Sequence, residues 1–373
     1  NNIAIGKLAM GVGDVSGADN IAIGTTAMDA LTTGKCNVAL GVDALGLSET
    51  SCWNIAIGNV AMGAGVTTGQ DNIAIGRITM DAVTSGAYNV AVGQAAMGAM
   101  TIGLYNVALG IGAMCGVTTG QADDNIAIGR NAMVGAAGTT GNDNIGIGRF
   151  SADALTTGCL NIAIGLDALG VSTTGCCNIA LGYLAMGGGD TTGVNNIALG
   201  SATMDALTTG ACNVAIGRQA MSGAQTGCFN IALGFETMNG VVTGINNTAI
   251  GSQAADALTT GICNVAIGTN ALGVSATSCD NIAIGELAQG TCLVTGIHNI
   301  ALGTSALTKV TSGNRNIAIG NLALCGNLAG TFQVAIGVEA LKDGVGSHNI
   351  GIGCAAARDA TGAGNIAIGS SAR

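Results

Sequence analysis

The chain repeats one short pattern of apolar and polar positions along its whole length. The pentad Asn-(Ile/Val)-Ala-(Ile/Leu)-Gly begins at residues 2, 20, 37, 54, 72, 89, 106, 125, 144, 161, 178, 196, 213, 230, 247, 264, 281, 299, 316, 333, 349 and 365. The 22 copies are spaced by 16 to 19 residues, most often by 17. A period of this length is typical of a solenoid, in which each repeat stacks on the one before it.

Within each copy, the alternation of residues predicts a short β-strand. Motif positions two and four are Ile, Val or Leu, apart from Thr248, and they share one face of a strand because side chains alternate. Position five is Gly in all 22 copies, which predicts a corner that needs positive φ or a close backbone approach. A second apolar pair follows, mostly Ala and then Met or Leu, and a Thr-Gly corner such as Thr33-Gly34 ends the unit. Apolar segments separated by Gly corners favour strands over helices.

We therefore predict an all-β protein, a parallel β-solenoid (β-roll) of about 22 coils with a 17-residue repeat. Residues 1–373 are expected to form a single continuous repeat array with no separate globular domain. Stacking at about 4.8 Å per coil would make a rod on the order of 100 Å long.

The first motif position predicts a ladder of stacked amides. It is Asn in 21 copies, and the exception, Gln333, keeps the amide group. Stacked amides hydrogen-bond from coil to coil, so only another amide can replace them. The first members of this structural ladder are Asn2, Asn20, Asn37, Asn54, Asn72, Asn89, Asn106 and Asn125.

The third motif position suggests that the chain associates with itself. If the Ile, Val and Leu side chains fill the coil, the Ala at position three points outward and forms a continuous apolar stripe, which is typical of an interface. The stripe predicts a homo-oligomer, and Asp at Ala163, Ala180 and Ala215 is expected to disrupt assembly or folding. The alternative is that another strand of the same coil covers these alanines.

Composition excludes several classes of protein. The chain is 49% hydrophobic with 64 Gly and no Pro, whereas disordered chains are poor in Ile, Val and Leu. The net charge is −10 with no basic cluster, so no nucleic-acid partner is expected. Residues 82–122 carry no charge, but glycines and polar residues interrupt them, so we expect no membrane insertion.

No group of residues suggests catalysis. His298 and His348 each precede a motif Asn but lie three coils apart, about 14 Å along a stack. The acidic residues are single corner residues, for which solvation is the ordinary role. We therefore predict no catalytic residues, no metal site and no cofactor, and a protein that is not an enzyme.

The unit Asn-Ile-Ala-Ile-Gly-x-x-Ala resembles the Ala-Ile-Gly repeats of trimeric autotransporter adhesin heads, and related repeats of viral tail-fibre and surface-fibre proteins. The resemblance implies a left-handed parallel β-roll, three of which pack around an axis to form an adhesive tip or shaft. A longer repeat and 13 cysteines distinguish this chain from the autotransporter heads.

The expected function is a structural or adhesive extracellular fibre or shaft segment, located at a cell or virion surface and associated through the Ala stripe. Its expected partners are other copies of itself, with a trimer implied by the resemblance, and a host or environmental surface. One alternative is a head-to-tail filament, because neither end of the sequence shows a polar capping coil. A less favoured alternative is an ice-binding solenoid based on Thr pairs such as Thr32-Thr33, of which only one Thr could belong to a given face.

Cysteine spacing predicts disulfides between adjacent coils. Nine of the 13 cysteines lie one or two residues before a motif Asn. Stacked coils bring such positions near the usual Cα separation of a disulfide, about 5.5 Å, and such bonds would indicate an oxidising, extracellular setting. The alternative is buried free thiols. The expected bonds join Cys36 to Cys52, Cys212 to Cys228, Cys263 to Cys279, and Cys159 to Cys177 or Cys176.

Overall fold

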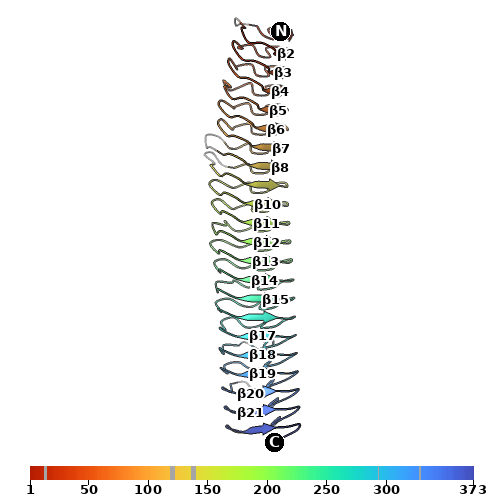
Figure 1. Ribbon diagram of the computed structural model, residues 1–373, viewed down its shortest axis with the longest axis vertical. Helices are drawn as coiled ribbons and strands as arrows, with labels where there is room; N and C mark the ends of the chain where they lie inside the picture. Colours follow the sequence, from red (N-terminus) through yellow and green to blue (C-terminus); the bar gives the residue numbers. More distant parts are fainter. Residues whose placement is uncertain (12–14, 118–121, 136–139, 293, 327–328) are drawn as a thin grey trace. The chain divides into compact units, whose positions relative to one another are not determined.

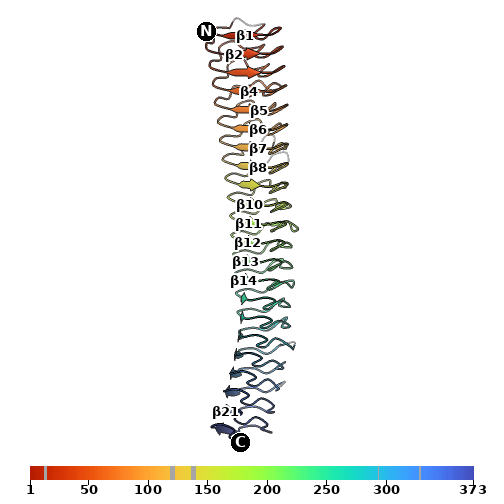
Figure 2. The same ribbon diagram turned by 90° about the vertical axis from the view of Figure 1, so that its right-hand side faces the viewer.

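The computed structural model describes residues 1–11, 15–117, 122–135, 140–292, 294–326 and 329–373. The chain divides into two compact units, Asn1–Thr192 and Gly193–Arg373. Each unit is a stack of similar coils with one short strand per coil (Figure 1 and Figure 2). The described residues contain 22 strands and no helix, which confirms the expected all-β solenoid with its repeat of about 17 residues. That all the coils form one uninterrupted array stays a prediction.

In the first unit, eleven three-residue strands form a parallel sheet, and each strand pairs with the next one in sequence. The register aligns motif with motif, so that Ile21 lies beside Val38 and Ala22 beside Ala39. The strands are β1 (Ile3–Ile5), β2 (Ile21–Ile23), β3 (Val38–Leu40), β4 (Ile55–Ile57), β5 (Ile73–Ile75), β6 (Val90–Val92), β7 (Val107–Leu109), β8 (Ile126–Ile128), β9 (Ile145–Ile147), β10 (Ile162–Ile164) and β11 (Ile179–Leu181).

The second unit repeats this arrangement with parallel pairing of consecutive strands. Its strands are β12 (Ile197–Leu199), β13 (Val214–Ile216), β14 (Ile231–Leu233), β15 (Thr248–Ile250), β16 (Val265–Ile267), β17 (Ile282–Ile284), β18 (Ile300–Leu302), β19 (Ile317–Ile319), β20 (Val334–Ile336), β21 (Ile350–Ile352) and β22 (Ile366–Ile368).

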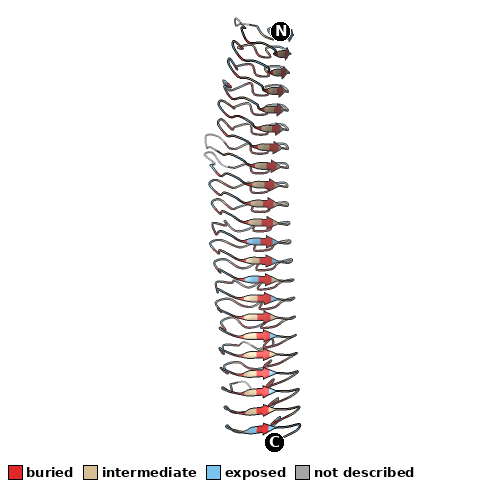
Figure 3. Ribbon diagram, in the orientation of Figure 1, coloured by how far each residue is buried: buried red, intermediate tan, exposed pale blue. Residues whose placement is uncertain are grey.

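The expected orientation of the strand residues is wrong, because the alanines and not the branched residues face the interior. Ala198 is fully buried, whereas Ile197 and Leu199 on either side of it are 37% and 43% exposed. In Figure 3, strand after strand combines a buried part with an intermediate or exposed part, and the buried residue is the central Ala. The interior is occupied from the opposite wall by the Met or Leu at motif position nine, such as Met204. At Gly146, the third motif position of its coil, an added Cβ would lie 2.6 Å from Cγ of Met133, so the position-nine side chain leaves little space beside the strand.

Ala163, Ala180 and Ala215 therefore do not form an outer stripe. All three are fully buried within the single chain, in β10, β11 and β13. Their burial is the arrangement that the alternative described, in which the same coil covers the alanines. The prediction of self-association through an outward Ala stripe is therefore wrong. The outward apolar face consists of the Ile, Val and Leu side chains.

The Gly corner at motif position five is confirmed. Gly24 has φ of 141°, and a Cβ there would lie 2.2 Å from the carbonyl oxygen of Gly41 in the next coil. In most coils, three further corners have left-handed backbone without glycine, as at Asp43 (φ 55°), Leu45 (φ 50°) and Trp53 (φ 57°). The sequence pattern does not reveal these corners, because left-handed conformations are uncommon for such residues.

Within the described residues, no helix is both long and apolar enough to cross a membrane.

Candidate interaction surface

The outward side of each sheet is the most distinctive surface of both units. We call it the apolar sheet face, and it consists of the side chains at motif positions two and four, for example Ile197 and Leu199 in β12. These positions are Ile, Val or Leu throughout the sequence, with Thr248 as the only polar residue. No charged residue interrupts the face from one strand to the next. An exposed apolar surface of this regularity is characteristic of an interaction site.

A buried amide ladder holds the strands beneath this face in register. The Oδ1 atom of Asn20 accepts hydrogen bonds from the backbone N–H and the Nδ2 group of Asn37, at 2.9 and 3.1 Å. The Nδ2 group of Asn37 also donates to the carbonyl oxygen of Ser51, at 2.7 Å. The same backbone bond joins each of the predicted ladder residues after Asn2 to Oδ1 of the motif Asn before it. The donors are Asn20, Asn37, Asn54, Asn72, Asn89, Asn106 and Asn125.

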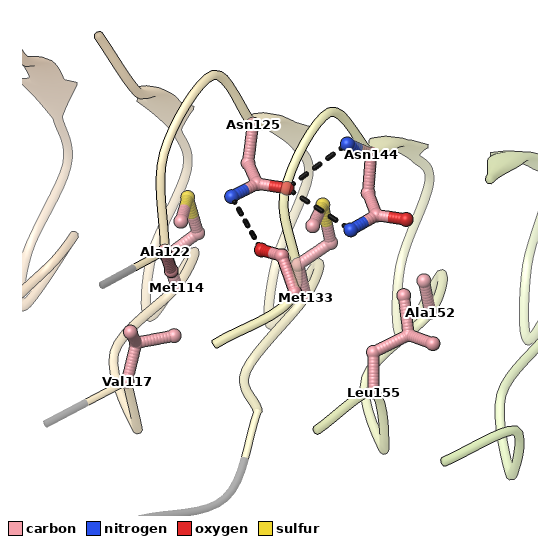
Figure 4. Close-up of a pocket in the computed structure, with 9 residues that line it drawn as sticks. Met114, Val117, Ala122, Asn125, Met133, Asn144, Ala152 and Leu155 are labelled. Carbon is pink, nitrogen blue, oxygen red and sulfur yellow. Dashed lines mark hydrogen bonds between the residues drawn. The ribbon is translucent and has the colours of Figure 1, made fainter. Parts of the chain in front are cut away.

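The ladder also passes beside a small internal void in the first unit. Figure 4 shows Asn125 accepting two hydrogen bonds from Asn144 and donating one through Nδ2 to the carbonyl oxygen of Gly141. The void has a volume of about 10 Å³ and is lined mainly by apolar groups, including Met114 and Met133. It offers no more space than a single water molecule needs, so it is a packing defect and no ligand site.

One member of the ladder fails to continue it. The backbone N–H of Gln333 donates to Oδ1 of Asn316 at 3.0 Å, as a motif Asn would. The Gln333 side chain is fully buried, and neither Nε2 nor Oε1 has a hydrogen-bond partner. The additional methylene of Gln displaces the amide from the place that an Asn amide occupies. From the sequence pattern alone, Gln and Asn are expected to be equivalent at motif position one. The structure shows that they differ in hydrogen bonding, because the Gln333 amide has no partner.

The cysteines of the expected disulfides lie in adjacent coils, and their sulfur atoms are not bonded to one another in this structure. The backbone N–H of Cys36 donates to Ala18 and that of Trp53 to Lys35, so Cys36 and Trp53 occupy equivalent places. Cys52 precedes Trp53 and is one place away from the column of Cys36. The same offset separates Cys212 from Cys228 and Cys263 from Cys279. These three disulfides stay predictions.

The fourth cysteine group differs from the other three. The thiol of Cys159 donates a hydrogen bond to Sγ of Cys176, with the two sulfur atoms 2.9 Å apart. Cys177 instead approaches Cys159 only through its backbone N–H, which donates to the Cys159 carbonyl oxygen at 2.9 Å. Cys176, and not Cys177, is therefore the sulfur neighbour of Cys159, because both occupy the second place before a motif Asn.

This contact affects the acidity of the Cys159 thiol. The hydrogen bond to Cys176, followed by burial and by the nearby thiols and Asp143, raises the pKa of Cys159 to about 11. The protonated form is therefore favoured at neutral pH, which makes Cys159 a poor nucleophile there.

The residues considered for catalysis are not brought together. His298 lies 3.8 Å from Asp280, whereas the His348 ring stacks on Phe332 with centroids 5.2 Å apart. The guanidinium group of Arg315 lies over the same Phe332 ring, 5.4 Å from its centre. No group of three or more His, Cys, Asp or Glu side chains among the described residues could hold a metal ion.

A column of half-buried aspartates was missed at the sequence level. Asp81, Asp153 and Asp256 each follow motif position nine, four and six coils apart. Burial raises the pKa of all three carboxyl groups, and for Asp153, where Asp167 adds to the effect, the pKa rises to about 6. The recurring Asp-Ala dipeptide is the signal that could have identified them.

No protein-family model matches this chain, and comparison with curated protein sequences gives no significant match.

Proposed function

We propose that this chain is a structural or adhesive segment of an extracellular fibre, and that its copies associate through the apolar sheet face. The observation that carries the proposal is the partial exposure of the Ile, Val and Leu side chains at motif positions two and four, which reaches 40% at Ile216 in β13 and at Ile231 in β14. This face replaces the Ala stripe as the surface of association.

Sheet physics supports a covered outer face. Parallel sheets in proteins almost always have both faces buried. Here the inner positions are fully buried, as at Ala215, whereas among the described residues the outer positions stay partly exposed, as at Ile216. A second copy of the chain offers an equally flat and apolar surface, so that two such faces can exclude water from each other.

The chemical inventory supports a structural role over a catalytic one. The histidines are separated, the aspartates lie singly along a column, and the described residues form no metal cluster. The extracellular location is proposed from the resemblance to fibre and adhesin repeats and from the predicted disulfides, and binding to a host or environmental surface from the same resemblance.

Native mass measurement tests the association. Wild-type protein is expected to form a discrete oligomer in sedimentation equilibrium at micromolar concentration. Changing Ile162, Ile164, Ile179 and Leu181 of β10 and β11 to Thr is expected to weaken association at least tenfold, because association would bury the part of these half-buried side chains that is still exposed, at about 25 cal/mol per Å².

A matched control keeps this test specific. Val171 is 43% exposed outside the strands, so Val171→Thr removes the same kind of surface elsewhere and should leave the oligomer unchanged. Thr keeps the strands folded, since it is a favourable strand residue. Wild-type protein that stays monomeric at all concentrations contradicts the proposal.

A further inference from the structure

Charged residues flank three strands of the first unit in the same order. An Asp directly precedes the motif Asn, and an Arg directly follows the motif Gly, in the segments 71–77, 124–130 and 143–149. These strands are β5, β8 and β9. We call Asp71, Asp124 and Asp143 the acidic edge, and Arg77, Arg130 and Arg149 the basic edge.

All six side chains are exposed, and none of them takes part in an ion pair within the described residues. The guanidinium groups of Arg130 and Arg149 lie over the ring of Phe150, 5.8 and 5.4 Å from its centre. Within one chain, Asp71 and Arg77 are separated by the whole strand, a span of up to about 20 Å at 3.3 Å per residue. The two edges therefore border the apolar sheet face on opposite sides without neutralising each other.

Two aligned arrangements can bring two copies of the face together. In the parallel arrangement, the stacks run in the same direction and the strands of the two copies run in opposite directions. The acidic edge of one copy then lies beside the basic edge of the other. In the antiparallel arrangement, the stacks run in opposite directions, and acidic edge meets acidic edge. Because like charges repel, the charge pattern favours the parallel arrangement.

The spacing of the charged strands also selects a register. With no offset, all three charged strands, β5, β8 and β9, meet their own equivalents, and every Asp faces an Arg. An offset of one coil keeps, of these strands, only the contact between β8 and β9, and it adds one between Lys7 beside β1 and Asp19 beside β2. Offsets of three or four coils likewise keep one contact, between β5 and β8 or between β5 and β9, and each adds one from Asp19 to Arg77 or from Lys7 to Asp71. The uneven spacing thus makes coil-for-coil alignment the best match.

We infer that the apolar sheet face of the first unit binds a second copy of this chain in parallel and in coil-for-coil register, with ion pairs from the acidic edge of one copy to the basic edge of the other. The inference rests on the proposed self-association and adds its orientation. Exposed ion pairs contribute little affinity, about twofold to fivefold each, so the apolar face supplies the binding and the charges choose its geometry.

The pattern does not recur in the second unit, which provides an internal comparison. Strand β17 is flanked by Asp280 and Glu286, two residues of the same charge. The variant Glu286→Arg gives β17 the order found at β5, β8 and β9, and is expected to tighten association by about twofold to fivefold.

A zero-length cross-link tests the geometry directly. The variant Arg77→Lys is prepared with ¹⁴N and with ¹⁵N, the two forms are unfolded and refolded together, and the assembly is treated with a carbodiimide. This reagent joins a carboxylate to an amine in contact with it. We expect an amide bond between Asp71 of one isotopic form and the amine at position 77 of the other, detected by mass spectrometry.

The controls separate this inference from the proposed function. Asp71→Asn combined with Arg77→Lys should lose the cross-link while the assembly keeps its mass. An assembly that forms but gives no mixed-isotope bond between positions 71 and 77 overturns the parallel register and leaves the proposed function standing. A wild-type chain that never assembles overturns both.

Discussion

At the scale of single residues, the amide ladder explains why one side-chain type recurs. In an Asn, the single methylene places Oδ1 where it accepts both the backbone N–H and the Nδ2 group of the next coil, as Asn37 does for Asn54. The same residue donates Nδ2 to a carbonyl oxygen one coil further on. All of these groups are buried, so each unpaired one would cost about 1–3 kcal/mol. The ladder is therefore sensitive to side-chain length as well as to chemistry.

Gln333→Asn is expected to stabilise the second unit. Asn at this position would supply the hydrogen bonds that the Gln333 amide lacks, to Asn349 and to a neighbouring carbonyl group. The free energy of unfolding should rise by about 1–3 kcal/mol, measured by urea denaturation. The reverse change one coil earlier, Asn316→Gln, should lower it by a similar amount, since Asn316 donates to Gly330 at 2.8 Å. Equal stabilities for wild type and Gln333→Asn would contradict this account of the ladder.

Cys159 and Cys176 are expected to form a disulfide when the protein is treated with oxidised glutathione. Two thiols are oxidised and one glutathione disulfide is reduced to two glutathione molecules, with the two protein sulfur atoms already 2.9 Å apart. Because the pKa of Cys159 is raised to about 11, its thiolate fraction, and so its alkylation by iodoacetamide, should rise about tenfold per pH unit between pH 7 and 10.

Peptide mapping without reductant identifies the product. The expected cross-linked peptide joins Cys159 to Cys176, and Cys176→Ala should both abolish it and speed the alkylation of Cys159 at pH 8, since the hydrogen bond from Cys159 is the largest cause of the raised pKa. A bond from Cys159 to Cys177 as the main product would show that the described sulfur geometry does not govern the reaction.

At the scale of the coil, the sequence predicts the strands and the Gly corners but not which way the strand residues point. The alternation of residues shows that the strand has two faces, but the pattern is the same whether the alanines or the branched residues face the interior. The Asn at motif position one indicates the orientation, because motif positions one and three share a face of the strand. An Asn side chain buried inside the coil, as at Asn196, requires the Ala two residues later, Ala198, to point inside as well.

The left-handed corners could not be predicted for a different reason. Motif position nine has φ of about 50° although it carries Met or Leu, as at Met204 (φ 51°) and Leu272 (φ 54°). Such residues are chosen for core packing, and tertiary contacts override the local preference against this conformation. The Cys159–Cys176 contact could be predicted from the sequence, since both residues occupy the same place in consecutive repeats.

Ala163→Leu is expected to unfold or strongly destabilise its coil. Ala163 is fully buried in β10, and a Leu there would meet the packed interior, a cost of about 1–3 kcal/mol or more. The neighbouring change Ile162→Ala removes atoms from the outer face and should alter the stability of the single chain much less. Urea denaturation at concentrations below association measures both. A larger loss from Ile162→Ala would instead support a strand whose branched residues point inward.

Asp153 should make the first unit less stable as the pH rises through the range from 4 to 6. Its folded-state pKa is raised to about 6, mainly by burial, above the ordinary 3.8 of an unfolded chain. The folded state therefore holds the proton more tightly, and stability falls as the pH increases between these two values. Asp153→Asn should remove this part of the pH dependence and stabilise the protein at pH 7, as measured by thermal unfolding at pH 4 and pH 7. An unchanged pH profile would show that another group is responsible.

At the scale of the molecule, each unit is a sum of similar coils that contact mainly their sequence neighbours. The described strands pair only with the preceding and following strand within each unit, so no distant segment has to be brought together. Stability in such an architecture is the sum of coil and interface contributions. Changing the number of coils should therefore be tolerated better than changing the length of one coil.

Deletion of residues 213–229 tests this additivity in the second unit. The segment is one complete repeat that begins at the motif Asn213, so its removal joins Cys212 to Asn230 and leaves every remaining motif in register. We expect the β-sheet circular dichroism to persist and the urea midpoint to fall only slightly. Deletion of 213–220 removes β13 but leaves half a coil, which cannot pair, and should lower the midpoint far more. If both deletions unfold the protein equally, the coils do not act as separable units, and the ladder must depend on contacts beyond adjacent repeats.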